Sequence, residues 1–305
     1  MTGNDETLPK KSGKKSKKDI IFLVIVCLLI FCGTYFALSA FSDYNSHKQA
    51  RDTWSDLRNE AYDPDFVPDA NAYDVRESSN DNKSRDDKSQ KPSSDMLLKI
   101  DFDKLQKKNG DVVAWIRIPD TQVDYPVMQE PVYPLSADVK DPKYLHKDIY
   151  GNDSISGSLF ITANYKNIDD LAHKIIYGHN MKDGSMFAVL SEYKNKDFLT
   201  EHPYFYVYYP DRTEKYIICS AAHTDDSSAI YKSPYHIDTN DYQDLIDHLM
   251  RISYYDMNKE FLNRKTRTIT LSTCDWISSD DGGRLAVTGS LCDTLYWSEV
   301  ENGGE

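Results

Sequence analysis

A cysteine at the end of an alternating segment is the first residue in this chain that could perform covalent chemistry. Residues 268–274 read Thr-Ile-Thr-Leu-Ser-Thr-Cys, and this alternation of polar and apolar side chains is typical of a strand with two different faces. It groups Thr270, Ser272 and Cys274 on the polar face, with Cys274 at the strand end. Cys274 is therefore a candidate thiol nucleophile.

The other cysteines are weaker candidates. Cys27 and Cys32 lie in a long apolar run, and Cys219 and Cys292 have apolar neighbours that suit a small buried side chain. Three cysteines lie beyond the apolar run, so at least one thiol has no partner within that part of the chain. The sequence contains no Cys-x-x-Cys pair and no His-Glu-x-x-His motif, so a zinc site has little support, and nothing indicates a cofactor.

Arg284 is a candidate partner of this cysteine. The alternation in residues 284–291 puts Arg284 on the polar face of a second predicted strand. The intervening residues 275–283 contain Asp-Asp-Gly-Gly, which is typical of a loop that joins adjacent strands. Arg284 and Cys274 are therefore expected to share one groove, although an arginine on a solvated strand face would give the same pattern.

A thiol nucleophile also needs a group that carries protons, which is usually a histidine. His179 stands out because residues 175–180, Ile-Ile-Tyr-Gly-His-Asn, place it where an apolar strand breaks at glycine into a loop. A loop histidine that only forms a hydrogen bond is the alternative. Chemistry alone does not choose among the eight histidines, which are His47, His146, His173, His179, His202, His223, His236 and His248.

Strands dominate the pattern from residue 96 onward. Helices are expected at residues 97–105 and around 245–252, and Asn240 with Gln243 resembles a capping box for the second helix. The predicted strands cover residues 112–118, 122–127, 158–162, 174–177, 204–209, 216–221, 267–273 and 284–291, with a hairpin turn at 210–214. A mainly β barrel with peripheral helices is the most economical arrangement.

An uncharged apolar run at residues 20–41 is long enough to cross a bilayer as a helix. Six lysines precede it, and positive flanks tend to stay in the cytoplasm, so residues 1–19 are expected to form a basic cytoplasmic tail. A cleaved signal peptide is the alternative, but Leu38 fits a cleavage site poorly and the run is too long. We therefore expect a single-pass anchor with the remainder of the chain outside the cell.

Composition divides the remainder of the chain. Residues 42–95 are polar and charged, which indicates a flexible extracellular tether with at most a short helix near Trp54 and Leu57. Residues 96–300 are expected to form one compact domain, and residues 301–305 a short tail. The net charge is −13 for the chain and −16 beyond the basic tail, so nothing implies a nucleic-acid partner.

Taken in order, these segments resemble the class B sortases of Gram-positive bacteria. Thr-Leu-Ser-Thr-Cys at 270–274 matches the family's TLxTC signature, and Arg284 follows ten positions after the cysteine in an Arg-Leu-Ala-Val run. Tyr-Gly-His-Asn at 177–180 resembles the segment that carries the family's histidine. Residues 109–116 and 123–127 resemble the entry to the class B domain. This ordered set of matches is far more specific than TLxTC alone.

The resemblance covers residues 96–297 and includes a long helix at 242–255. It implies a sortase-type closed β-barrel with peripheral helices, preceded by one transmembrane helix. It also implies that His179, Cys274 and Arg284 form the catalytic set, without metal or cofactor. Residues 160–167 lack the Asp and Arg that class B relatives usually carry there.

The function implied by the resemblance is a two-step acyl transfer. Cys274 would attack the threonine carbonyl of a sorting motif near the C-terminus of a secreted protein, and an amine of peptidoglycan or of a lipid-linked precursor would then take the acyl group. His179 would move protons and Arg284 would stabilise the developing oxyanion. Three alternatives are a pilus polymerase that uses a lysine amine, a secreted cysteine protease that uses water, and a membrane-tethered binding module.

Overall fold

The computed structural model describes residues 17–63, 66, 94–129, 142–161, 168–232, 234–256, 258–274 and 283–298. The chain divides into two units, Met1–Lys48 and Gln49–Glu305. The long helix α1 (Lys17–Ala61) runs through the division between them.

In the first unit, α1 contains the apolar run that the sequence predicts to be a membrane span. Its apolar side chains are exposed, and the helix is long and apolar enough to cross a membrane by length and composition. A signal sequence would meet the same test. The helix is thus a candidate span.

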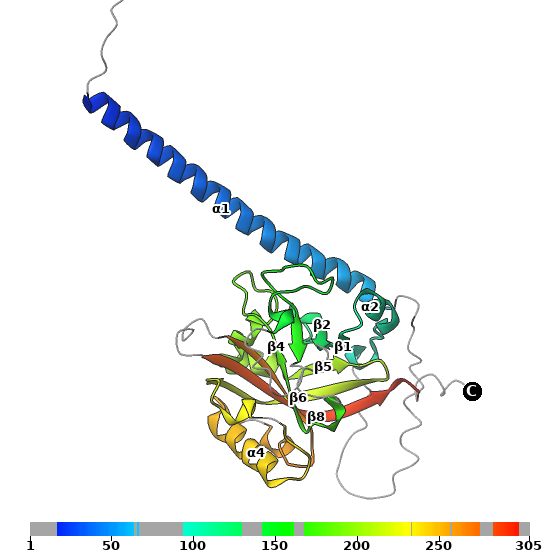
Figure 1. Ribbon diagram of the computed structural model, residues 1–305. Helices are drawn as coiled ribbons and strands as arrows, with labels where there is room; N and C mark the ends of the chain where they lie inside the picture. Colours follow the sequence, from blue (N-terminus) through cyan, green and yellow to red (C-terminus); the bar gives the residue numbers. More distant parts are fainter. Residues whose placement is uncertain are drawn as a thin grey trace, which may run out of the picture. The chain divides into compact units, whose positions relative to one another are not determined.

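In the second unit, eight strands of the described residues close into a barrel in the order β1-β2-β3-β4-β7-β8-β6-β5 (Figure 1). The strands are β1 (Val112–Arg117), β2 (Asp124–Gln129), β3 (Leu159–Ile161), β4 (His173–Tyr177), β5 (Tyr204–Tyr208), β6 (Arg212–Thr224), β7 (Thr268–Cys274) and β8 (Arg284–Tyr296). The β2/β3 and β4/β7 pairs are parallel, and the other ladders are antiparallel. The predicted mainly β closed barrel with peripheral helices is confirmed.

Short helices surround the barrel. Besides the end of α1, the α-helices in the described part of this unit are α2 (Phe102–Lys108), α3 (Lys196–Glu201) and α4 (Asn240–Ile252). The 3-10 helices there are η2 (Ser94–Leu97), η3 (Lys143–Leu145), η4 (Ile168–Asp170), η5 (Ala188–Lys194), η6 (Ala229–Tyr231) and η7 (Lys259–Phe261). The predicted helix at 97–105 is displaced, because the Asp101 carboxylate accepts the Lys104 N–H and starts α2 there. The cap of α4 is Thr239 rather than Asn240, since the Thr239 hydroxyl accepts the Tyr242 N–H.

Two apolar cores lie on opposite faces of the central strands. Ile176, Leu271 and Val287 belong to the main core, whereas Ile175 and Ala286 belong to a second core with α4. Figure 1 shows α4 outside the barrel, where it packs against β6. The face that the sequence predicts to be a polar groove is therefore mostly covered.

The polar residues on the covered face pair with one another. Thr270 and Thr288 are fully buried, and their hydroxyls lie 2.6 Å apart across β7 and β8. The hydrogen bond offsets the cost of burying both hydroxyls. The predicted site residues lie beyond these threonines, at the strand ends.

The strand β6 begins at Arg212, inside the segment predicted to be a turn. Arg212 and Glu214 are buried, and the Arg212 Nε–H donates to Glu214 Oε1 at 2.8 Å. A charged pair inside the barrel has the sequence pattern of a surface turn, which explains the difference.

The helix α1 also differs from expectation, because it continues to Ala61 through the first part of the predicted tether. Trp54, Leu57 and Ala61 are buried in the main core and lie at helical spacing on one face. The second unit therefore begins well before residue 96. Residues 67–93 of the predicted tether and the tail at 301–305 lie outside the described residues.

Candidate active site

Three strands bring the predicted site residues to one edge of the barrel. β4 and β7 run parallel with Tyr177 opposite Ser272, and β7 and β8 run antiparallel with Cys274 opposite Arg284. His179 and Cys274 each follow the Tyr177–Ser272 pair by two residues. The register therefore gathers the backbone positions of His179, Cys274 and Arg284 at the same edge.

The imidazole of His179 is half-buried and held from one side. Its Nε2–H donates to the Leu145 carbonyl at 2.7 Å, which leaves Nδ1 as the basic nitrogen of the neutral ring. Gly178 allows this placement, because a Cβ there would lie 2.3 Å from Leu159 Cδ2 and 2.8 Å from Phe187 Cδ2. This close packing around Gly178 fixes the point at which the chain leaves β4 and turns into the loop that begins at His179.

The surroundings of His179 favour its neutral form. Burial lowers the pKa of His179, the hydrogen bond to Leu145 acts in the opposite direction, and the charge of His146 lowers the pKa further. The ring centroids of the two histidines are 6.1 Å apart. At neutral pH the ring is therefore mostly neutral, which suits it to accept a proton.

Arg284 opens β8 and brings a permanent positive charge to the same edge. Its side chain is half-buried, and Nη1–H donates to the Gly283 carbonyl at 3.2 Å. A guanidinium carries five N–H donors and stays protonated throughout the working pH range. It is therefore suited to stabilise a peptide carbonyl or an oxyanion.

Two cysteines of the second unit lie away from this edge. Burial raises the pKa of Cys219 to about 12. Cys292 is exposed, contrary to expectation, but it lies eight residues after Arg284 on β8, and its Sγ–H donates to the Lys215 carbonyl at 3.3 Å. Cys274 stands instead at the end of β7, and residues 275–282 after it lie outside the described residues. Cys219 and Cys292 are therefore poor candidates for the nucleophile.

An aromatic group borders this edge, and sequence reasoning missed it. The hydroxyls of Tyr231 and Ser272 lie 2.9 Å apart, and the Tyr231 ring stacks on Tyr177 with centroids 6.4 Å apart. Tyr177 stacks in turn on Phe160 at 5.5 Å. Tyr231 comes from η6, 41 residues before Ser272, and no local pattern identifies it.

Comparisons with known proteins identify the family to which this barrel belongs. The Sortase domain family model matches residues 116–292. Sortase B of Listeria monocytogenes is 32% identical over 190 residues, which are 61% of this chain and 72% of the relative. Sortase B of Staphylococcus aureus is 29% identical over 194 residues, which are 62% of this chain and 74% of the relative. A solved structure of sortase B from Listeria monocytogenes is 35% identical, covers 62% of this chain and 99% of that one, and has a TM-score of 0.52.

This chain belongs to the sortase family. Its similarity to sortase B proteins in sequence and structure assigns it to class B, and it is a cysteine transpeptidase. Membership in the family implies sorting-signal substrates, a peptidoglycan amine as acceptor and a place at the cell surface.

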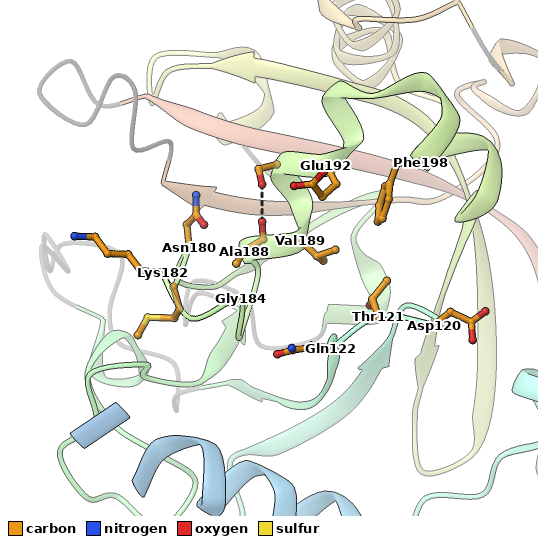
Figure 2. Close-up of a pocket in the computed structure, with 12 residues that line it drawn as sticks. Asp120, Thr121, Gln122, Asn180, Lys182, Gly184, Ala188, Val189, Glu192 and Phe198 are labelled. Carbon is orange, nitrogen blue, oxygen red and sulfur yellow. Dashed lines mark hydrogen bonds between the residues drawn. The ribbon is translucent and has the colours of Figure 1, made fainter. Parts of the chain in front are cut away.

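A pocket of about 670 Å³ lies beside the loop that follows the histidine of this sortase (Figure 2). The loop closes on itself, because Asn180 and Met186 form a β-bridge and the Phe187 N–H donates to the His179 carbonyl at 2.9 Å. The pocket is lined by Asp120, Thr121, Gln122, Asn180, Met181, Lys182, Gly184, Ala188, Val189, Ser191, Glu192 and Phe198. The loop thus forms one wall of a cavity next to the candidate base.

In the part of the chain that the structure describes, no group of three or more His, Cys, Asp or Glu residues could hold a metal ion. The residue types whose backbones meet at this barrel edge, a cysteine, a histidine and an arginine, are those that covalent acyl transfer by a thiol requires.

Proposed function

We propose that this sortase cleaves a C-terminal sorting motif of secreted proteins after a threonine and transfers the new acyl end to an amine of peptidoglycan or of a lipid-linked precursor. The observation that supports this best is the register that gathers the backbones of His179, Cys274 and Arg284 at one barrel edge. These three residues are the proposed catalytic set.

In the first step, the Cys274 thiolate attacks the threonine carbonyl carbon, and a C–S bond forms as the carbonyl oxygen gains negative charge. Arg284 donates hydrogen bonds to that oxygen. The oxyanion then collapses and the C–N bond breaks. The imidazolium of His179 protonates the leaving amine, which departs with the downstream segment.

In the second step, the acceptor amine attacks the thioester carbonyl. Neutral His179 takes a proton from the attacking nitrogen, the C–S bond breaks, and the thiolate is restored. The active form needs thiolate and imidazolium together. Since burial lowers the pKa of His179, this form is a minor fraction at neutral pH.

A mass-spectrometric assay tests this function. Full-length protein in detergent is incubated with LPxTG-like and NPxTN-like peptides and an added amine. We expect a peptide–amine product and a thioester adduct that is lost in Cys274→Ala but kept in the matched control Cys292→Ala. Identical products from wild type and Cys274→Ala would exclude the mechanism.

The same assay separates the alternatives. Preference for a lysine side chain over peptidoglycan amines would indicate a pilus polymerase. Hydrolysed peptide as the main product despite added amine would indicate a protease.

We also propose that α1 anchors the enzyme with its basic end in the cytoplasm and the barrel outside. The length and apolar composition of α1 and the lysines before it support this orientation. Protease added to intact protoplasts is expected to digest the barrel and spare an epitope tag at residue 1. A tag that is digested from outside would reverse the topology.

A further inference from the structure

The last turns of α1 belong to the unit that contains the barrel. Trp54 and Leu57 are 3% and 0% exposed in the main core, and the Trp54 Nε1–H donates to Ser156 Oγ at 3.2 Å. The same helix contains the apolar run at residues 20–41, which ends ten positions before Arg51. These buried contacts fix the last turns of α1 against the barrel, so this part of the helix can hold the residues that it contacts in place.

One of its contacts reaches the loop that follows His179. Arg51 Nη1 pairs with Asp183 Oδ2 at 3.1 Å. The other oxygen of Asp183 accepts the Ser185 N–H at 3.1 Å and the Ser185 hydroxyl at 2.6 Å. Asp183 thus joins the helix to the turn of the loop.

A second route runs through Tyr125 on β2. The Trp54 ring meets the Tyr125 ring edge to face with centroids 5.9 Å apart, and the guanidinium carbon of Arg58 lies 5.5 Å from the centroid of the same ring. The Tyr125 hydroxyl in turn accepts the Met186 N–H at 3.3 Å. Through these contacts, α1 and β2 hold the loop at two places. One is its turn, at Asp183 and Ser185, and the other is its returning arm, the stretch from Met186 to Phe187 that leads back toward His179.

The returning arm leads back to the candidate base. Met186 has a left-handed backbone conformation with φ 55°, which is unfavourable for any residue other than glycine. Contacts with the surrounding structure must therefore stabilise this conformation. Met186 bridges Asn180, and the next residue, Phe187, donates to the His179 carbonyl. Movement of this arm would shift the backbone of His179 and the pocket wall shown in Figure 2.

We propose that Arg51, Trp54 and Tyr125 are positioning residues that hold the His179 loop in its productive geometry, so that the helix next to the membrane supports catalysis. The proposal rests on the proposed function, in which His179 is the proton carrier. None of the three residues takes part in the chemistry. They act through Asp183 and Met186 on the backbone that presents the imidazole.

The test uses the full chain in detergent and compares Arg51→Ala, Arg51→Lys and the control Lys48→Ala, an exposed lysine three residues earlier on the same helix. Arg51 is an exposed side chain, so its removal is expected to leave the melting temperature unchanged. We expect Arg51→Ala to lower kcat about 3–10-fold with little change in KM for the sorting peptide, because a small displacement of a catalytic group slows the chemical step. Arg51→Lys should restore most of the rate, and Lys48→Ala should match wild type.

Hydrogen exchange gives a readout that does not depend on activity. Arg51→Ala is expected to speed amide exchange at residues 183–187 and to leave exchange in β7 and β8 unchanged. Tyr125→Phe keeps the ring and removes the hydroxyl acceptor, so it should speed exchange at Met186 and lower kcat in the same direction. Wild-type exchange and wild-type kcat in both variants would overturn the proposal.

A His179→Gln variant separates this proposal from the proposed function. If His179→Gln is inactive while Arg51→Ala and Tyr125→Phe behave as wild type, only the positioning role is wrong. If His179→Gln keeps full activity, the proposed proton carrier is wrong, and the positioning proposal falls with it.

Discussion

Burial of the His179 imidazole lowers its pKa and so opposes the protonated form of the ring. The half-buried ring favours the neutral form, yet the first step proposed here needs the imidazolium. The Leu145 carbonyl partly compensates, because it accepts the Nε2–H in either protonation state. The protonation of His179, together with that of Cys274, therefore sets how much of the enzyme is active.

His146 offers a direct way to change that balance. Its charge lowers the pKa of His179, and its own side chain is exposed, so His146→Gln should leave the fold intact. Without the neighbouring charge the pKa of His179 rises, and the acidic limb of the pH profile of kcat/KM moves to higher pH. The active fraction rises with it. An acidic limb that stays in place, with the exposed His236→Gln as control, would show that His146 does not influence the base.

Arg284 is expected to matter far more for rate than for stability. Its side chain is half-buried, and the oxyanion that it is proposed to stabilise exists only during the reaction. Arg284→Ala should lower kcat about 10²–10³-fold, as loss of an oxyanion donor does elsewhere, and should change the free energy of unfolding by about 0.5 kcal/mol or less. Arg284→Lys keeps the positive charge but lacks the planar guanidinium, so its kcat should lie between that of the wild type and that of Arg284→Ala. Activity and melting temperature that decline in parallel would indicate a structural arginine instead.

At the scale of elements, the site depends on where each strand stops. The β4/β7 register is extended by the bond from the Gly178 N–H to the Ser272 carbonyl at 3.1 Å, after which the chain turns into the His179 loop. The space above Gly178 is filled by Leu159 and Phe187. A side chain at this strand end would have to displace one of these two residues.

Gly178→Ala is therefore expected to disturb stability and activity together. The added Cβ must displace Leu159 or Phe187, which costs about 1–3 kcal/mol by the usual cost of overpacking. The shift also moves His179, so kcat/KM should fall about tenfold or more. Denaturant unfolding and steady-state kinetics measure the two effects. Gly110→Ala is the matched control, because a Cβ at Gly110 meets no atom within 4 Å.

The sequence predicted strands whose apolar residues alternate or follow one another. β7 and the first part of β8 alternate, whereas Ile175 and Ile176 mark β4 as an apolar run. The β7/β8 register places the backbones of Cys274 and Arg284 opposite each other. Prediction failed where polar residues are buried. Arg212 is buried in β6, where it pairs with Glu214 at 2.8 Å and with Asp169 at 2.6 Å, so this charged stretch of the strand resembled a turn. Asp169 lies 43 positions before Arg212, and local sequence does not reveal that contact.

Long-range contacts account for the remaining differences. Trp54 and Leu57 form only a short apolar stripe in a charged segment, which is too little to distinguish a docked helix from a tether. Tyr231 reaches Ser272 from a distant 3-10 helix. The loop contact between Arg51 and Asp183 spans 132 positions of sequence. No local periodicity encodes contacts of this kind.

At the scale of the whole molecule, the position of the second unit's boundary decides which fragment of the enzyme can be studied without the membrane. Residues 49–61 add Trp54, Leu57 and Ala61 to the main core, and the Tyr62 hydroxyl donates to Asp124 Oδ1 at 2.6 Å. A fragment that starts at residue 96, where apolar residues return in the sequence, lacks all of these contacts. We propose that the catalytic domain starts near residue 49.

Leu57→Ala measures how much this helix contributes. Leu57 is fully buried, so its truncation in fragment 49–305 should lower the free energy of unfolding by about 2–5 kcal/mol, whereas Asp56→Ala on the exposed face should have little effect. Fragment 96–305 should be less stable than fragment 49–305 and should turn over sorting peptide more slowly, because it also lacks the Arg51 contact to the His179 loop. Equal melting temperatures and equal kcat for the two fragments would show that the helix is only a spacer. A loss of stability with unchanged kcat would separate the two roles, and would leave the helix as part of the core but not of the site.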